Sequence, residues 1–380
     1  MVNAHGHDIT AGGVEKGIAM LSDELVRRGH EVAFLNAFPG GRVDPGMDVT
    51  VLHGDDWRGH PVRRVRNHVG DVVARPSRAV AETIARVRPD AVHSHNLPGL
   101  STGVWEASRR QGVPVLHTLH DYHLLCPRTT LMRRDGTTPC SPHPLLCGLR
   151  TRSLARWAGG VTSLAGVSQY LLDLHDHLFP GIPHHVVRNP MVLPTAPPEI
   201  RPPARRLAAL GYIGNLDVVK GVDLLLQAAP ALEPLDCELH IAGTGRLRDE
   251  VVAAAERWPF VHYHGVVSGE AKDEFFAVCD AGIVPSVWAE PGGPTHTLIE
   301  WVCSGRPVLV SDRGGLGEVV GLYPGAIRVE PTADGIRRGI AELAEPARWR
   351  SLLASLEPID SSGELDRWVR AHEEIYQSML

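Results

Sequence analysis

Cysteine and long apolar runs are both scarce in this sequence. Six cysteines in 380 residues are too few for a scaffold held by disulfides, so we expect reduced thiols and a cytoplasmic protein. No stretch of about 18 apolar residues occurs, which argues against a transmembrane helix. The first residues, MVNAHGHDITAGGVEKG, also lack the basic and then apolar pattern of a signal peptide.

A basic excess is missing as well. The net charge is −6, whereas nucleic-acid binders usually carry a basic excess or stripe, so no nucleic-acid partner is expected. Hydrophobic residues make up 43% of the chain and charged residues 22%, which is typical of a globular protein with a real core. A chain of this length is expected to form two domains.

Short apolar runs alternate with helical patterns along most of the chain, which is typical of parallel α/β units. The pattern breaks at 189–206, where six prolines occur without a helical or strand period. It then restarts. We therefore predict an α/β protein with two facing, doubly wound, Rossmann-like domains and a cleft between them. The predicted parts are an N-terminal domain at 1–190, a linker at 191–206, a second domain at 207–362, and a helix at 363–380 that returns to the first domain.

Ligands of such sheets lie beyond the carboxyl ends of the strands, and one candidate there is Lys220. The segment YIGNLDVVKGVDLLLQAAPAL, residues 212–232, reads as a strand, a polar turn and a helix. The N-terminus of a helix favours an anion, Lys220 adds a full positive charge, and Gly221 has no side chain to block approach. The turn therefore suggests a phosphate site. The alternative is an ordinary solvated lysine.

Two glutamates form the second candidate. Glu290 and Glu300 bracket the Gly/Pro-rich stretch PGGPTHTLI, which runs into a predicted helix. The loop amides are suited to an anion, and a carboxylate such as Glu300 can accept hydrogen bonds from two vicinal hydroxyls. The alternative is a glutamate near a helix start that compensates the helix dipole.

Several segments in the same order resemble one enzyme family. They are GGVEKGIAMLSDELVRRGHEVAFL, LHDYHLLCPRTTLMRRDGTTPC, VSQYL, VVRNP, YIGNLDVVKGVDLLLQAAPAL, IAGTGRL, VPS and GRPVLVSDRGGLGEVV. Together they are similar to the retaining family-4 glycosyltransferases of the GT-B fold, of actinobacterial type, from Gly12 to about Glu318. The resemblance implies a UDP-, GDP- or dTDP-linked sugar donor and a small polar acceptor. It also implies same-face displacement without a metal or other cofactor, in antibiotic or cell-surface glycan biosynthesis.

The resemblance also implies roles for individual residues. Three are expected to act in catalysis: His120 at the sugar or acceptor, Lys220 on the diphosphate and Glu290 against the transferred sugar. Glu300 would hold the ribose. The remaining donor-binding candidates are Gly12, Gly13, Asn215, Gly243, Gly245, Gly292, Gly293, Thr295, His296, Thr297 and Leu298, and the acceptor-binding candidates are His95, Asn96, Asp121 and Tyr122.

Two positions depart from the family pattern. Asn215 stands where family members usually have an arginine, so half of the phosphate clamp is replaced by a neutral amide. Nine residues separate Glu290 from Glu300, whereas the family has seven. The longer loop suggests an unusual donor sugar.

Other functions are less well supported by the sequence. An NAD(P)-dependent dehydrogenase would need a third glycine where GTGRLRD has Arg248. His120, His123 and Cys126 are spaced like metal ligands, yet the paired zinc pattern does not occur, so no metal is expected. A GT-B epimerase or phosphorylase, and a non-catalytic sugar-nucleotide sensor, stay open.

Overall fold

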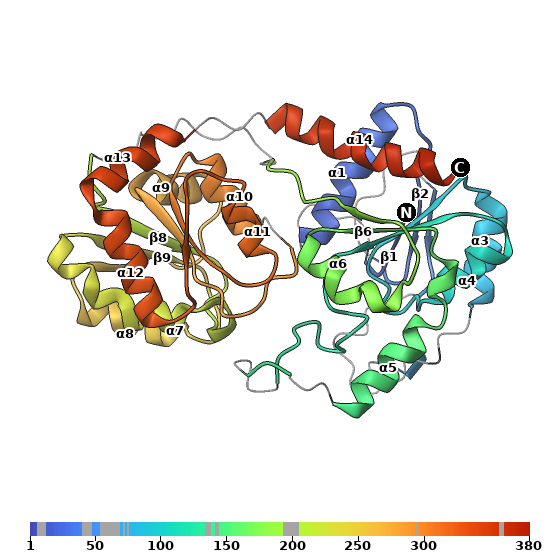
Figure 1. Ribbon diagram of the computed structural model, residues 1–380, viewed down its shortest axis with the longest axis horizontal. Helices are drawn as coiled ribbons and strands as arrows, with labels where there is room; N and C mark the ends of the chain where they lie inside the picture. Colours follow the sequence, from blue (N-terminus) through green and yellow to red (C-terminus); the bar gives the residue numbers. More distant parts are fainter. Residues whose placement is uncertain are drawn as a thin grey trace. The chain divides into compact units, whose positions relative to one another are not determined.

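The computed structural model describes residues 1–5, 13–39, 48–53, 69–70, 73, 76–133, 138–140, 144–192, 205–292, 295–356 and 361–380. The chain divides into two compact units (Figure 1). Unit 1 comprises Met1–Leu131, Cys140–Asn189 and Asp366–Leu380, and unit 2 comprises Met132–Pro139 and Pro190–Leu365. The predicted linker at 191–206 falls mostly outside the described residues.

Unit 1 is built on one parallel sheet in the order β3-β2-β1-β4-β5-β6-β7. Its strands are β1 (Val2–Asn3), β2 (Ala33–Asn36), β3 (Asp48–Val51), β4 (Val92–Ser94), β5 (Val115–Leu119), β6 (Ser163–Gly166) and β7 (His184–Val186). Its helices include α1 (Gly13–Arg27), α3 (Arg78–Val87), α4 (Gly103–Arg110), α5 (Leu145–Ala155) and α6 (Gln169–His175).

The core of unit 1 follows the sequence pattern. Every residue of β5 is buried, as expected for a central parallel strand with helices on both faces. On α1, Ile18, Leu21 and Leu25 are spaced three and four apart on one face of the helix, and all three are buried. The strand before α1 has only two residues, and it pairs with both β2 and β4.

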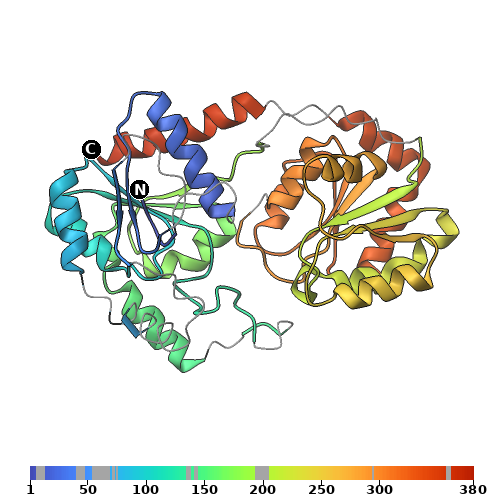
Figure 2. The same cartoon turned by 180° about the vertical axis from the view of Figure 1, so that it is seen from behind.

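The last helix, α14 (Ser361–Met379), brings the chain back to unit 1 from Asp366 onward. Its Ile375 packs in one cluster with Leu116 of β5 and Ala165 of β6. Arg28, just after α1, donates hydrogen bonds to the carboxylates of Asp366 at 2.7 Å and Glu373 at 2.8 Å. Figure 2 shows α14 beside α1 from the reverse side.

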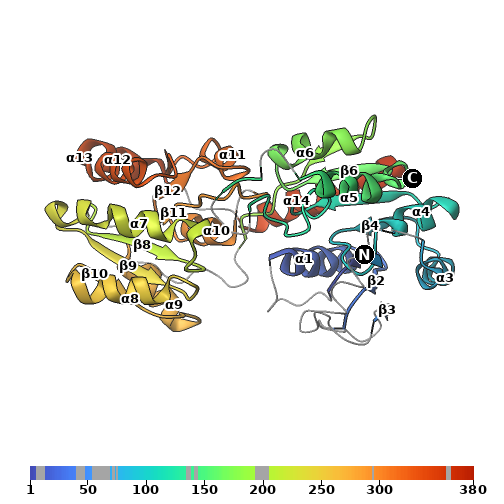
Figure 3. The ribbon, with the colours of Figure 1, turned by 90° about the horizontal axis from the view of Figure 1, so that it is seen from below.

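Unit 2 has a second parallel sheet in the order β10-β9-β8-β11-β12-β13 (Figure 3). Its strands are β8 (Ala209–Ile213), β9 (Glu238–Ala242), β10 (Val261–Tyr263), β11 (Ala281–Val284), β12 (Val308–Ser311) and β13 (Ala326–Val329). Its helices include α7 (Val222–Ala228), α8 (Arg248–Arg257), α9 (Glu270–Val278), α10 (His296–Cys303), α11 (Leu316–Val320), α12 (Ala333–Ala344) and α13 (Pro346–Ser355).

Helices cover both faces of this sheet. Apolar residues of α7, α8, α12 and α13 pack in one core cluster, and those of α9, α10 and α11 pack in another. The prediction of two doubly wound, Rossmann-like α/β sheets is therefore confirmed.

Trp301 fixes the position of α10 on the sheet. Its indole is fully buried, and it lies against Gly211 of β8 and Gly282 of β11. A Cβ at Gly211 would stand 2.4 Å from the ring, and one at Gly282 would stand 2.2 Å from it. Glycines on two strands thus make room for one large side chain, and Glu300 is its neighbour on the helix.

Candidate functional site

The turn after β8 brings Lys220 to the loop after β11. Val218–Lys220 forms one 3-10 turn, capped by the Asp217 side chain, which accepts from the amide of Val219. Gly221 follows with φ +74°, and a Cβ there would stand 2.0 Å from the Pro285 carbonyl oxygen. A side chain would be strained in this conformation and would collide with the neighbouring backbone. Glycine therefore lets the two loops touch.

Lys220 and Glu290 are in direct contact. The ammonium lies 2.6 Å from Glu290 Oε1 and 5.0 Å from the ring centre of Trp288. Ser286 Oγ donates to the same carboxylate oxygen at 2.7 Å. The Lys220 side chain is 30% exposed and that of Glu290 is 5% exposed. The two catalytic candidates of unit 2 therefore form one partly buried cation–carboxylate pair.

The second glycine turn, SDRGGLGE, holds the Glu290 backbone in place. The Glu290 carbonyl oxygen accepts from the Gly315 amide at 2.7 Å. Gly314 has φ +58°, and a Cβ at this position would stand 2.3 Å from the same oxygen. These contacts anchor the start of the loop between Glu290 and α10.

Glu300 lies within α10 and also pairs with a lysine. The Thr295 side chain caps this helix by accepting from the Leu298 amide at 3.3 Å. Lys272 of α9 donates to Glu300 Oε1 at 2.5 Å. Sequence reasoning missed Lys272, which lies 28 residues away and reaches Glu300 because α9 and α10 share one core cluster.

The two glycines after β9 allow a close approach to the loop after β8. A Cβ at Gly243, which has φ +133°, would stand 1.8 Å from the Gly214 carbonyl oxygen. A Cβ at Gly245 would stand 2.3 Å from the Leu216 carbonyl oxygen and 2.5 Å from Asn215 Oδ1. This close packing explains why both positions are glycine, and their role in donor binding stays a prediction.

The remaining donor candidates differ in accessibility. Gly12 and Gly293 lie outside the described residues, and Gly13 opens α1 at an exposed position. Gly292 and Thr297 are partly buried, and His296 is exposed at the start of α10. Leu298 is fully buried in the core cluster of α9, α10 and α11. The donor-binding role of Leu298 stays a prediction, and its side chain is not exposed.

In unit 1, two histidines meet at the ends of adjacent strands. His95 directly follows β4 and His120 directly follows β5, and His95 Nδ1 lies 3.0 Å from His120 Nε2. Burial, with a smaller contribution from His372, lowers the pKa of His120 to about 3. Its imidazole is therefore neutral at ordinary pH, and the two rings share one hydrogen bond.

Beside these rings lies a small hollow that opens to solvent. Its polar lining includes the side chains of His95, Asn96, His120 and Asp121. Burial raises the pKa of the Asp121 carboxyl to about 6, although this carboxylate accepts a hydrogen bond from the His123 amide at 2.7 Å. Four acceptor-site or catalytic candidates thus share one polar hollow.

Tyr122 is not part of this lining. Its side chain is fully buried, and its carbonyl oxygen accepts from the amides of Leu125 and Cys126 in a tight turn. That Tyr122 contacts an acceptor stays a prediction, and its side chain packs inside unit 1.

Behind the hollow lies a histidine that the sequence did not single out. His93 Nε2 lies 2.7 Å from Thr118 Oγ1, and its Nδ1 lies 2.7 Å from the Tyr376 hydroxyl of α14. Its ring centre is 4.0 Å from that of His95. Helix α14 therefore holds the His93 ring in place, and His93 in turn packs against His95.

Two protein-family models match the chain, one over each domain. Glycosyltransferase Family 4 matches residues 11–193, and Glycosyl transferases group 1 matches residues 208–345. The two domains are those of a family-4-type glycosyltransferase. Within the described part of the chain, no helix has the length and apolar character needed to cross a membrane.

Individual relatives are distant but cover most of the chain. An uncharacterised 42.6 kDa protein from the cps region of Klebsiella pneumoniae is 23% identical over 88% of this chain and 90% of its own length. The D-inositol 3-phosphate glycosyltransferase of an Arthrobacter species is 26% identical over 82% of this chain and 76% of its own.

Solved structures of similar fold include Anabaena HepE in complex with UDP. It has a TM-score of 0.67 and 15% identity, with 99% of this chain and 98% of that chain covered. The lipopolysaccharide outer core galactosyltransferase WaaB has a TM-score of 0.64 and 15% identity, with 100% and 99% covered. These neighbours have the GT-B fold that the sequence predicted.

This glycosyltransferase has an arginine close to Asn215, although not at the family's position. Arg246 donates two hydrogen bonds to the Asp217 carboxylate, at 2.7 and 2.8 Å. These bonds hold the pKa of Asp217 below its usual value. Asp217 caps the Lys220 turn, and Arg246 follows Gly245. The guanidinium therefore links the loop after β9 to the loop after β8, which carries Asn215 and Lys220.

Lysine is rare in this glycosyltransferase, and its distribution is a signal that sequence reasoning overlooked. The 380 residues contain three lysines, Lys16, Lys220 and Lys272. Two of the three pair with the two candidate glutamates, Glu290 and Glu300. A chain that otherwise uses arginine as its cation thus places ammonium groups beside both carboxylates.

Proposed function

We propose that the chain is a retaining glycosyltransferase that moves a sugar from a nucleoside diphosphate to a small polar acceptor without a metal ion. The contact between Lys220 and Glu290 carries this proposal. It joins the loops after β8 and β11 at the carboxyl ends of the unit 2 strands, where open α/β sheets bind ligands.

The proposed role of Lys220 is to stabilise the leaving diphosphate. Breaking the sugar–phosphate bond builds negative charge on that group, and a fixed cation lowers the barrier by favouring this charge. An ammonium has three N–H donors, and among the described residues that of Lys220 donates one hydrogen bond, to Glu290. Phosphate oxygens can take the others. Arg246 would supply the second cation that Asn215 does not provide.

The two glutamates would hold the donor from either side. Glu290 is buried and anchored through its backbone, so its carboxylate can accept hydrogen bonds from sugar hydroxyls at a fixed position. Glu300 would accept from the ribose hydroxyls. The long loop between them would shape the pocket for the sugar.

The acceptor would bind in the hollow of unit 1. Because its pKa is depressed to about 3, His120 is poorly suited to act as a general base at neutral pH. It would instead orient the acceptor hydroxyl through a hydrogen bond. The hydroxyl oxygen then bonds to the anomeric carbon on the face that the diphosphate leaves, and the departing phosphate oxygen takes the hydroxyl proton.

Structural neighbours support a nucleotide-sugar donor and a glycan product. Anabaena HepE has been solved with UDP and with UDP-glucose. The lipopolysaccharide outer core galactosyltransferase WaaB favours a cell-surface glycan over an antibiotic as the product.

Thermal unfolding of the chain with UDP, GDP and dTDP tests the donor site, because a ligand that binds the native state raises its Tm. One of the three should raise the Tm, and Lys220→Ala should abolish the rise. Release of that nucleoside diphosphate from the matching sugar nucleotide should then require an acceptor. Release of a sugar isomer without an acceptor would indicate an epimerase, and binding without turnover across many acceptors would indicate a sensor.

A further inference from the structure

A cluster of polar side chains lies on one face of β9 and β10. The two strands are parallel neighbours with His262 opposite His240. Because side chains alternate along a strand, Glu238 lies on the same face as His240, and His264 lies on the same face as His262. Leu239 and Ile241 of β9 point into the core on the other face.

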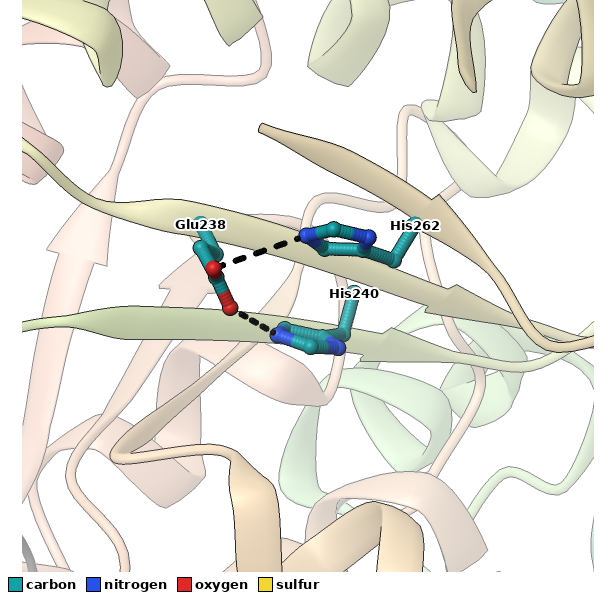
Figure 4. A group of neighbouring side chains, drawn as sticks. All are labelled: Glu238, His240 and His262. Carbon is teal, nitrogen blue, oxygen red and sulfur yellow. Dashed lines mark hydrogen bonds and ion pairs between the residues drawn. The ribbon is translucent and has the colours of Figure 1, made fainter. Parts of the chain in front are cut away.

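Three of these residues place their possible ligand atoms close together. His240 Nε2 lies 3.1 Å from Glu238 Oε2, and His262 Nε2 lies 3.7 Å from Glu238 Oε1. Figure 4 shows both rings turned toward the same carboxylate. The three ligand atoms all lie within 4.8 Å of one another. No other group of three or more such residues is found in the described ranges.

One ring nitrogen of the cluster lacks a hydrogen-bond partner. Among the described residues, His262 Nε2 is buried and has no hydrogen-bond partner, since 3.7 Å is too long for one. His240 Nδ1 lies 2.9 Å from His264 Nε2, so His264 can orient the ring as a hydrogen-bond acceptor.

We propose that Glu238, His240 and His262 bind a divalent transition metal, with zinc as the best match. Two imidazoles and one carboxylate are a ligand set that zinc uses, and a water molecule would complete four-coordination. Ligand atoms of a tetrahedral zinc lie about 3.3 Å apart for bonds of about 2.0–2.1 Å. The observed 3.1 and 3.7 Å, which end on different oxygens of the Glu238 carboxylate, lie on either side of that value. The widest separation among the three ligand atoms, up to 4.8 Å, would have to shorten when the ion binds.

This site is structural and separate from the proposed transfer reaction. Glu238 and His240 lie at the start and middle of β9, whereas the donor candidates Gly243 and Gly245 follow its carboxyl end. The metal would tie β10, which ends the sheet order, to β9. The inference goes beyond the proposed function and does not depend on it, because sugar transfer is expected to proceed after chelation.

The test is zinc titration of the chelator-treated full chain by calorimetry, with Co²⁺ absorption as a second reading. We expect one site per chain, a higher Tm with zinc, and visible bands typical of four-coordinate Co²⁺. His262→Gln and Glu238→Gln should each weaken binding by at least about tenfold, as loss of a ligand requires. His264→Gln should weaken it less.

The matched control is His30→Gln. His30 lies 3.0 Å from Glu373 but belongs to no three-residue group among the described residues. This variant should bind zinc like the unaltered chain. Equal zinc affinity and equal Co²⁺ bands in the unaltered chain and in His262→Gln would overturn the proposal. His262 is partly exposed, so its substitution tests the site even where His240→Gln fails to fold.

Discussion

Lys272 on α9 donates a hydrogen bond to the Glu300 carboxylate on α10, 2.5 Å away. If Glu300 holds the ribose, Lys272 neutralises a carboxylate that would otherwise repel the donor diphosphate. We expect Lys272→Met to raise the donor KM about three- to tenfold, with little change in kcat. This range corresponds to the loss of a partly exposed ion pair worth about 1 kcal/mol. Glu300→Ala should raise it more.

Arg348→Met is the matched control for this prediction. It removes another ion pair of unit 2, with Glu342 on α12, and should leave the donor KM unchanged. An unaltered donor KM in both Lys272→Met and Glu300→Ala would remove this pair from the donor site.

For Lys220, a double variant separates a catalytic role from a structural one. Lys220→Ala should lower kcat by at least about tenfold, or about 1.4 kcal/mol. It should also lower the Tm, because it leaves the buried Glu290 carboxylate without its cation. Adding Glu290→Gln should restore the Tm but not the rate. Recovery of both in the double variant would show that Lys220 serves only to balance Glu290.

The pH dependence of transfer should report on Asp121 rather than His120. Burial raises the pKa of Asp121 to about 6 and lowers that of His120 to about 3. If the ionised Asp121 positions the acceptor, kcat/KM should fall as the pH drops through about 6. Asp121→Asn should abolish this fall, and His120→Gln should keep it at a lower overall rate. The opposite pattern would assign the titration to the histidine.

Unit 1 should lose stability in acid because its buried histidines are neutral. Burial lowers the pKa of His117 and His120 to about 3 and that of His372 to about 4, against about 6.5 in an unfolded chain. The unfolded state therefore binds more protons below about pH 6.5, so stability falls as the pH falls, by up to about 1.4 kcal/mol per pH unit for each histidine.

Tm measured between pH 7 and pH 4 checks this expectation. His372→Gln should make the decline shallower, since one fewer proton is taken up on unfolding. His177→Gln, at an exposed position, serves as the control. An equal slope in His372→Gln and the unaltered chain would contradict the linkage.

The packing of Trp301 predicts a coupling between the core and the donor site. Gly282→Ala would place a methyl group 2.2 Å from the indole, and overpacking of this kind costs about 1–3 kcal/mol. The shift of α10 should also raise the donor KM through Glu300. Gly17→Ala, where nothing lies within 4 Å on α1, should instead be neutral or stabilising by up to about 1 kcal/mol. Similar Tm values for the two variants would refute this account.

Much of the fold followed from local sequence patterns. Strands such as Val115–Leu119 and Glu238–Ala242 coincide with the short apolar runs of the sequence. Helix α12 likewise carries readable helical spacing at its buried residues Ile336, Ile340 and Leu343.

The site residues were harder to predict, because they depend on packing between distant segments. Tyr122 and Leu298 stand beside polar candidates, yet their side chains turn into the core. Lys272 reaches Glu300 only through helix packing. The metal ligands depend on the register of β9 against β10, which places His262 opposite His240 and which alternation within either strand does not specify.

Because lysine is rare in this protein, chemical footprinting of its amino groups is simple to interpret. A reagent selective for primary amines meets only three lysines along the chain, and two of them, about 30% exposed, adjoin the candidate glutamates. Loss of modification at those two positions, read by mass spectrometry, would therefore map sugar-nucleotide occupancy almost free of background from other side chains.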